Sequence, residues 1–389
     1  MAPIRVALIG LSAAAKTSWA EEAHLAYLNS EFGKKHYAIV ALLNSSVAAA
    51  ESAKSRFSLP QAKTYGDPKA LASDPDIDLV VCNTRADVHL PTVEPSLRAG
   101  KAVYVEWPLT EDLASAIRLT QNERIPGSIA GLQGRVSPIP LRLKEILASG
   151  AIGKVLSSNV SAFGNLMQRD ALPKSLKYFA DRKVGGHQIN IHFGHMIDYV
   201  QDVIGEFEEV QSKMQIQRST LRVIGADGKE TGTVKSDVPD LLVVHGTLKK
   251  GTTDIVDNAT LAVTFRCGQP FKGKPSLTWS INGSKGELLI TTPGPYLMSG
   301  DSYNGPITIE LHDHATDEVR DMGWDWKDWQ KKLPIRSRSV GEVYERYAAW
   351  VENGRPDEVK EGSDWPRLHD AMVRMENFDR LYKQFDPEW

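Results

Sequence analysis

The chain has 389 residues, of which 41% are hydrophobic and 24% are charged, a composition typical of a folded protein large enough for two cores. Its 46 basic and 49 acidic residues give a net charge of −3. No stripe of Lys and Arg favours direct binding to nucleic acid. No apolar run approaches the roughly 20 residues that span a bilayer, and no secretory leader is recognised. We therefore expect a cytoplasmic protein without a membrane partner, with the nucleus as an additional compartment.

The first third of the chain alternates short apolar runs with helical patterns. The expected strands are 4–9, 37–43, 79–83, 102–106 and 127–131. The expected helices are 13–30, 48–56, 91–99 and 113–123. Continuous apolar strands that alternate with helices are typical of a parallel, doubly wound α/β sheet. We assign residues 1–131 to a dinucleotide-binding Rossmann domain.

From about residue 155 the pattern becomes rich in β-strands separated by turn residues. The expected strands are 155–163, 207–216, 241–248, 258–265, 276–282, 287–291 and 307–311. One helical stretch, 187–204, interrupts them. This pattern predicts an α+β domain with a large, mainly antiparallel sheet, which we assign to residues 132–339. Residues 340–389 return to helices, at 340–352 and 365–383, which we expect to pack back on the core.

The two cysteines and a cluster of tryptophans are best explained by packing and not by a functional site. Cys82 and Cys267 both lie in apolar, strand-like runs, which predicts buried thiols in a reducing compartment and no metal site. Trp324, Trp326 and Trp329 form a cluster, which we interpret as a loop anchored by aromatic burial. A platform for a partner or a substrate is the alternative.

A phosphate-binding turn is expected directly after the first strand. The positions of a G-x-G-x-x-G fingerprint are occupied by Gly10, Ser12 and Ala15. Only the first glycine is present, so an ordinary strand-to-helix turn is the alternative. The location after a clear strand in an alternating series nevertheless favours a cofactor turn, with the pyrophosphate at the helix N-terminus.

The end of the second strand bears on the choice of cofactor. NAD-binding domains usually place an acidic residue there, but this chain has Ser45 and Ser46 and no carboxylate until Glu51. Because a carboxylate would repel a 2′-phosphate, its absence favours NADP, with NAD as the alternative. Asn83 and Arg85 follow the third strand and are expected to line the same cleft.

Several segments resemble the glucose-fructose oxidoreductase/inositol dehydrogenase (Gfo/Idh/MocA) family. The run Val103–Leu109, with its Glu-Trp-Pro, is similar to the family's Glu-Lys-Pro segment, and the Phe-Gly-His of 193–195 is similar to its histidine-bearing helix. The resemblance covers nearly the whole chain. Within the family, the chain most resembles the branch of the fungal galactose-regulon repressor, an NADP-binding transcriptional inhibitor. The segments that carry this resemblance are the Glu-Trp, the stretch 132–138 and the Lys-Tyr of 177–178.

The resemblance implies roles for individual residues. Trp107 stands where the family has its catalytic lysine, and an indole cannot exchange a proton at neutral pH. Ile191 stands at the position of the family's aspartate, whereas His195 keeps the family's histidine. His89 matches a position beside the nicotinamide half of the cofactor, and Glu106 is expected at the nicotinamide ribose. A general acid/base supplies about 10²–10⁴-fold in rate, so the loss of the lysine puts the usual mechanism in doubt.

Two functions follow from these observations. In the first, the chain is an NADP-dependent oxidoreductase for a small sugar-like or carbonyl/hydroxyl substrate. His195, His192 and Tyr178 are then the catalytic candidates, and Arg135, Lys177 and His187 are the substrate-binding candidates. A metal site built from the three histidines is disfavoured, because the family works without metal.

In the second, the chain is a non-catalytic regulator that senses NADP and binds a protein partner, although the sequence reveals no clear groove for one. We favour the oxidoreductase, because the retained histidine and the polar pocket residues suit a small ligand. The resemblance also implies a homodimer or a homotetramer, assembled through the open face of the sheet.

Overall fold

The computed structural model describes residues 2–13, 18–121, 127–166, 168–298, 300–357, 359 and 362–389. Contacts divide the chain into two compact units, each built from two stretches of chain. The first unit comprises residues 1–136 and 326–375, and the second comprises residues 137–325 and 376–389. The segment 326–375, which follows the β-rich region in the sequence, therefore packs with the N-terminal part.

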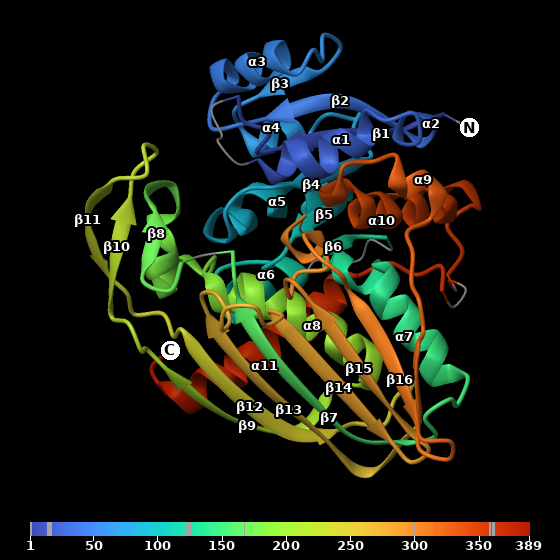
Figure 1. The fold of residues 1–389 in the computed structure, drawn as a ribbon. Helices are drawn as coiled ribbons and strands as arrows, with labels where there is room; N and C mark the ends of the chain where they lie inside the picture. The colour runs from blue at the N-terminus through green and yellow to red at the C-terminus, as the bar shows by residue number, and fades with distance from the viewer. Residues whose placement is uncertain are drawn as a thin grey trace. The chain divides into compact units, whose positions relative to one another are not determined.

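The first unit contains a parallel sheet with the strand order β3-β2-β1-β4-β5-β6 (Figure 1). The strands are β1 (Ile4–Ile9), β2 (Tyr37–Leu43), β3 (Lys63–Tyr65), β4 (Leu79–Cys82), β5 (Ala102–Glu106) and β6 (Ile129–Gly131). All four residues of β4 are buried, as the continuous apolar run predicts for a strand covered on both faces. The predicted Rossmann sheet is thereby confirmed.

Helices and helical turns surround this sheet. They are η1 (Ala20–Leu25), α1 (Ala26–Leu28), α2 (Gly33–His36), α3 (Val47–Arg56), α4 (Pro68–Ala72), η2 (Ala86–Val88), α5 (His89–Arg98), α6 (Leu113–Thr120), η3 (Gln133–Val136), α9 (Asp328–Lys331) and α10 (Ile335–Glu352). Side-chain N-caps begin three of them, because Ser46, Asp67 and Asp112 accept backbone N–H groups of α3, α4 and α6. The predicted helix 13–30 includes residues 14–17, which lie outside the described residues.

Aromatic residues join α10 to the core of the first unit. Tyr344 of α10 stacks on Tyr27, with ring centroids 5.1 Å apart and planes 4° from parallel. Tyr37 of β2 donates its hydroxyl hydrogen to the backbone oxygen of Tyr344 at 2.6 Å. Both contacts are buried, so α10 is part of the core of the cofactor domain and not an appendage.

The second unit is built on a large sheet with the strand order β17-β16-β15-β14-β7-β13-β12-β9. The strands are β7 (Val155–Gly164), β9 (Phe207–Gln215), β12 (Leu241–Leu248), β13 (Ile255–Cys267), β14 (Leu277–Gly283), β15 (Gly286–Thr292), β16 (Thr308–Asp313) and β17 (Glu318–Asp321). Among the described strand pairs of this large sheet, only β7 and β13 run parallel, and the other pairs are antiparallel. The predicted α+β domain with a mainly antiparallel sheet is therefore confirmed.

Helices cover one face of this sheet, and a small sheet lies beside it (Figure 1). The helical elements are α7 (Pro138–Ala148), η4 (Lys174–Ala180), η5 (Arg182–Val184), η6 (Ile189–Phe193), α8 (Gly194–Ile204), η7 (Gly300–Tyr303) and α11 (Leu368–Phe385), whose second half belongs to this unit. The small sheet has the order β11 (Glu230–Lys235), β10 (Thr220–Ile224) and β8 (Ala171–Pro173). The sequence analysis did not predict this small sheet, because β11 is almost entirely exposed and carries no apolar alternation.

The cysteines and the tryptophan cluster have structural positions. Cys82 and Cys267 are free, buried thiols, as predicted. Trp326 is buried beneath the guanidinium of Arg338, and Trp329 packs on Phe32 in the first unit. In the second unit, the Trp324 indole donates to the backbone oxygen of Ile307 at 3.0 Å. The indoles thus anchor the chain, as the favoured interpretation predicts. No helix in the described ranges is long and apolar enough to cross a bilayer.

Trp279 is the largest completely buried side chain of the second unit. It lies in β14, where residues alternate between buried and half-buried, and its indole N–H donates to Ser158 Oγ at 2.9 Å. Tyr199 of α8 packs against its ring, with centroids 6.1 Å apart. Trp279 therefore links the sheet to the helix that covers it.

We predict that Trp279→Ala lowers the free energy of unfolding by about 3–5 kcal/mol. The substitution leaves a cavity and removes the indole donor to Ser158 Oγ, although the Ser158 hydroxyl still donates to Ser280 O. Urea denaturation followed by circular dichroism measures the loss. The matched control is Phe271→Ala, since Phe271 is 78% exposed and its removal should change stability by less than about 0.5 kcal/mol. Equal losses of stability in the two variants would contradict the conclusion that Trp279 links the sheet to its covering helix.

Candidate functional site

The turn after β1 is shaped by Gly10. Its φ of +86° lies in the region that favours glycine, and a Cβ at this position would lie 2.9 Å from the backbone oxygen of Asn83. The Gly10 N–H donates to Leu43 O at 3.1 Å, so the ends of β1, β2 and β4 meet here. Ser12 follows, half-buried, in the same turn. Ala15, the third position of the predicted fingerprint, lies outside the described residues.

The end of β2 carries no carboxylate. Asn44 donates its side-chain amide hydrogens to Leu11 O at 2.9 Å and to Ala49 O at 3.2 Å, which ties this strand end to the turn after β1. Ser46 accepts the Ala49 N–H at 3.1 Å as the N-cap of α3, whereas Ser45 is exposed. Of the two predicted serines, Ser46 is therefore engaged as a helix cap, whereas the Ser45 side chain is exposed after the strand.

Two buried amides at this edge of the sheet lack protein partners. Both polar side-chain atoms of Asn83, after β4, and of Gln133, after β6, are buried and make no hydrogen bond within the described structure. An unsatisfied buried amide is unfavourable by about 1–3 kcal/mol, so such groups in a native protein require an explanation. A nicotinamide dinucleotide offers donors and acceptors in its carboxamide and ribose groups, and these side chains fit it.

Glu106, at the end of β5 between those two amides in the strand order, is held by a buried chain of hydrogen bonds. His24 Nε2 lies 2.8 Å from Glu106 Oε1, and His24 Nδ1 lies 2.8 Å from the Tyr344 hydroxyl oxygen. His24 is completely buried. Gly131 of the neighbouring strand leaves the space for the other carboxylate oxygen, because a Cβ there would lie 2.5 Å from Glu106 Oε2. The carboxylate is therefore fixed in position.

Other predicted residues of the first unit have protein partners. Both ring nitrogens of the buried His89 face backbone oxygens, those of Leu109 at 3.1 Å and Thr84 at 2.9 Å, so this residue connects two loops at the sheet edge. Burial lowers the pKa of His89. Arg85 forms a two-bond ion pair with the nearby Asp87 carboxylate. Trp107 is only 5% exposed.

Arg135, predicted to bind substrate, belongs to the first unit. It forms an ion pair with Asp370 at 2.9 Å, and its side chain is 14% exposed. Its charge is therefore already balanced by a carboxylate from a segment more than two hundred residues away in the sequence. Such a pair orients the guanidinium, and the sequence gives no sign of it.

In the second unit, His192 and His195 lie one turn apart where η6 continues into α8. His192 is 5% exposed, and its ring lies 4.7 Å from that of Tyr296. Its Nδ1 has no hydrogen-bond partner among the described residues. Burial and, to a smaller extent, the charge on His195 lower the pKa of His192 to about 3. His192 is therefore neutral at cellular pH, whereas His195 is half-buried.

His187 lies in an aromatic cluster at the start of the same segment. Its ring contacts those of Tyr382 and Trp389 edge to face, and its Nδ1 accepts the Asn190 N–H at 3.4 Å. It is completely buried, and burial lowers its pKa to about 3. This packing holds the beginning of η6 in place. Substrate contact through His187 stays a prediction.

Tyr178 and Lys177 lie in η4, against the small sheet. Tyr178 is half-buried with its ring edge on Phe179, and Phe179 in turn lies 6.2 Å from His192, ring centre to ring centre. Lys177 is exposed. The structure thus connects Tyr178 to the histidine segment through Phe179. No group of three or more His, Cys, Asp and Glu side chains in the described ranges is arranged to hold a metal ion.

Sequence reasoning missed His24 and Tyr344. His24 lies in an Ala-rich helical stretch where it had no distinguishing neighbour, and Tyr344 lies 320 positions further along the chain. Gln133 lies in the stretch 132–138 that carries the resemblance, but it is not among the predicted site residues. The one local signal for His24 was a polar residue on an otherwise apolar helix face.

The first unit therefore has the architecture of a dinucleotide-binding domain, and the second is a sheet domain of the kind found in two-domain oxidoreductases. Residues 4–131 match the oxidoreductase family described by its NAD-binding Rossmann fold. Residues 138–292 match the Gal80p C-terminal domain. The chain belongs to the Gfo/Idh/MocA oxidoreductase family and carries the second domain of its Gal80-type branch.

Relatives of both kinds are similar to this chain. The dehydrogenase aclE of Aspergillus oryzae is 32% identical over 298 residues, which cover 76% of this chain and 78% of the relative. The galactose/lactose regulatory protein GAL80 of Kluyveromyces lactis is 28% identical over 74% of this chain, but the match spans only 64% of that protein. The solved structure of a Saccharomyces cerevisiae Gal80p super-repressor mutant has the same fold, with a TM-score of 0.84 at 24% identity over 100% of this chain and 97% of that one.

The buried histidines make the stability of the protein depend on pH. Unfolded histidine binds a proton near pH 6.5, but His192 in the folded protein does so only near pH 3. Below pH 6.5 the unfolded state therefore binds a proton that the folded state does not bind. This lowers the free energy of unfolding as the pH falls, by about 2 kcal/mol at pH 5.

We predict that His192→Asn flattens the fall in unfolding free energy between pH 7 and pH 5, measured by urea denaturation at each pH. The control is His314→Asn, because His314 is exposed in the turn between β16 and β17, and this variant should keep the wild-type slope. A wild-type slope in His192→Asn would refute the burial argument.

Proposed function

We propose that the protein is an NADP-dependent oxidoreductase for a small sugar-like or carbonyl/hydroxyl substrate. The observation that carries the proposal is the pair of buried, unpartnered amides, Asn83 and Gln133, on either side of the fixed Glu106 carboxylate. These groups fit the polar atoms of a nicotinamide and its ribose. The family's NAD-binding Rossmann fold supports the same assignment.

The preference for NADP rests on the end of β2. Ser45 is exposed there, Ser46 caps α3, and neither brings a negative charge to the strand tip. A carboxylate at this position would favour NAD by binding the ribose 2′-hydroxyl and by repelling a 2′-phosphate. Gly10, with Ser12 and Ala15 as the predicted turn residues, would receive the pyrophosphate.

His195 is the proposed acid/base. When bound, a nicotinamide cofactor donates or accepts a hydride, and the substrate oxygen must then gain or lose a proton. Trp107 cannot handle that proton, and His192 is held neutral by burial. His195 is only half-buried, and an imidazole has a suitable pKa for proton transfer at cellular pH. Tyr178 is the second catalytic candidate, and Arg135, Lys177 and His187 are the proposed substrate contacts.

A regulator without turnover is the second candidate. Trp107 at the position of the family lysine and the Gal80-type second domain both support it. In this case the protein would sense NADP and bind a protein partner, in the cytoplasm and the nucleus. For either function we propose a homodimer or homotetramer. The sheet face that carries the exposed Val243 and Leu289 is its interface.

We predict that the purified protein oxidises NADPH with a carbonyl substrate from a panel of sugars, polyols and ketones. His195→Ala should lower kcat by about 10²–10⁴-fold through loss of the acid/base. NADPH binding, measured by fluorescence, should remain within about twofold, because His195 is not a cofactor contact in this proposal. His314→Ala, in the exposed turn between β16 and β17, is the matched control and should retain full activity.

Two results distinguish the candidates. Full turnover in His195→Ala would remove His195 from the mechanism and leave the oxidoreductase assignment in place. Tight NADPH binding without turnover across the whole panel would overturn the oxidoreductase assignment and favour the regulator.

We predict that Ser45→Asp weakens NADP binding at least about 10-fold more than NAD binding, because the new carboxylate repels only the 2′-phosphate. Isothermal titration calorimetry with both cofactors measures the ratio. Ser45→Asn, which has the same shape without the charge, is the control and should change the two affinities equally. Equal losses in Ser45→Asp would show that the 2′ position lies elsewhere.

A further inference from the structure

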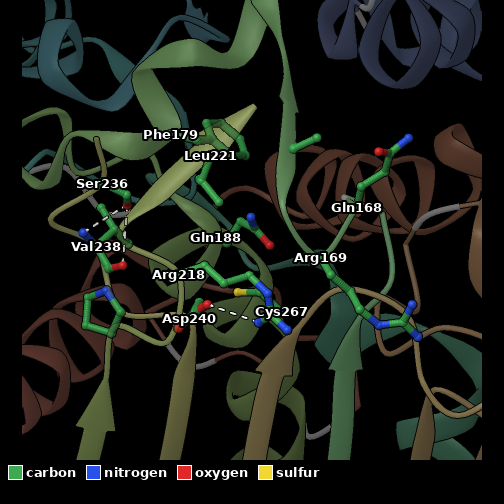
Figure 2. A pocket seen from close by; sticks show the side chains of 12 residues that line it. Gln168, Arg169, Phe179, Gln188, Arg218, Leu221, Ser236, Val238, Asp240 and Cys267 are labelled. Carbon is green, nitrogen blue, oxygen red and sulfur yellow. Dashed lines mark hydrogen bonds and ion pairs between the residues drawn. The ribbon is translucent and has the colours of Figure 1, made fainter. Parts of the chain in front are cut away.

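A hollow in the second unit lies where the end of β13 meets the small sheet (Figure 2). It encloses about 380 Å³ of space, including its open mouth. Phe179 and Leu221 form an apolar wall, whereas Arg218, Arg169 and Gln188 contribute polar groups. All of these residues belong to the second unit.

Positive charge exceeds negative charge around this hollow. Arg218 pairs with Asp240 at 3.4 Å, and both line the hollow. Arg169 donates to the backbone oxygens of Gln269 at 3.0 Å and Pro270 at 2.9 Å. Arg266, next to the lining residue Cys267, donates only to backbone oxygens in the described structure. The hollow is therefore lined by two arginines and one carboxylate, and Arg266 lies next to the lining residue Cys267 in the chain.

The mutual repulsion of these arginines is visible in Arg266. Burial lowers the pKa of Arg266, and the charges of Arg169 and Arg218 lower it further. Cys267 does not offset the excess charge, because burial raises the pKa of its thiol and keeps it neutral. An anion in the hollow would relieve this repulsion, and a carboxylate matches the planar fork of a guanidinium.

Gln188 adds a second requirement for the ligand. Its side-chain oxygen is buried and has no hydrogen-bond partner among the described residues. Figure 2 shows the Gln188 side chain between Phe179 and Arg218. A carbonyl oxygen only accepts hydrogen bonds, so the ligand should carry a donor such as a hydroxyl group close to its anionic end.

We propose that this hollow binds a small hydroxy carboxylate, with its carboxylate on Arg218 and Arg169 and its hydroxyl donating to Gln188. The apolar wall excludes water from one side of the ligand, which strengthens both interactions. Phe179 separates the hollow from His192, so the site adjoins the histidine segment. The proposal depends only on residues of the second unit and does not require cofactor binding.

Fluorine NMR of the full-length protein without cofactor tests the charge requirement. We expect trifluoroacetate to show line broadening that saturates with protein concentration, whereas the neutral trifluoroacetamide, of nearly the same shape, does not. Arg218→Gln should weaken trifluoroacetate binding about 10-fold or more, because a charged hydrogen bond is lost. The matched control Arg222→Gln should leave binding unchanged, because Arg222 does not line the hollow and pairs with Asp170 and Glu230.

Displacement of the probe tests the class of ligand. Glycolate should displace trifluoroacetate more strongly than acetate does, and Gln188→Leu should abolish that difference. Because Arg218→Gln leaves Asp240 unpaired, the double variant Arg218→Gln/Asp240→Asn checks the result without a lone carboxylate. Equal binding of the amide probe, undiminished binding in both Arg218 variants, or stronger displacement by phosphate than by glycolate would each overturn the proposal.

Discussion

The parallel direction of the strands in the first sheet determines where its polar groups meet. Because all of these strands run the same way, the segments that follow them collect at one edge. Gly10, Asn83, Glu106 and Gln133 come from different segments of the chain and are brought to that edge by strand order alone. Most polar groups inside the unit are paired, but the two amides at this edge are not. The position that we propose for the cofactor follows from this combination of topology and unsatisfied hydrogen bonding.

The sequence predicted what depends on local pattern. Buried parallel strands such as β4 are short apolar runs bounded by turn residues, and the helix after His192 has a strong apolar period, so both could be recognised. Contacts between distant segments were not predictable. The ion pair of Arg135 with Asp370, and the hydrogen bond of His24 with Tyr344, have no counterpart in any local pattern. The hollow around Arg218 likewise depends on the small sheet, whose exposed strand β11 gave no apolar signal.

Both candidate functions depend on binding a dinucleotide, and they differ in whether a residue replaces the family lysine at the position of Trp107. A fixed Glu106 and two unpaired amides suit a dinucleotide in an enzyme and in a sensor alike. Trp107 removes the proton-transfer group that the family places there, so catalysis would require a histidine of the second unit to take its role. Similarity both to a dehydrogenase and to a Gal80 regulator is consistent with a scaffold that keeps its cofactor edge while its chemistry changes.

The contribution of α10 to the first unit has a consequence for how the protein is made. Ribosomes release the sheet of the first unit early, but Tyr344, which contacts His24, Tyr27 and Tyr37, emerges only after nearly the entire second unit. During that interval the aromatic surface of the first unit is uncovered, and the His24 imidazole lacks one of its two partners. The nascent cofactor domain is therefore incomplete until translation has almost finished.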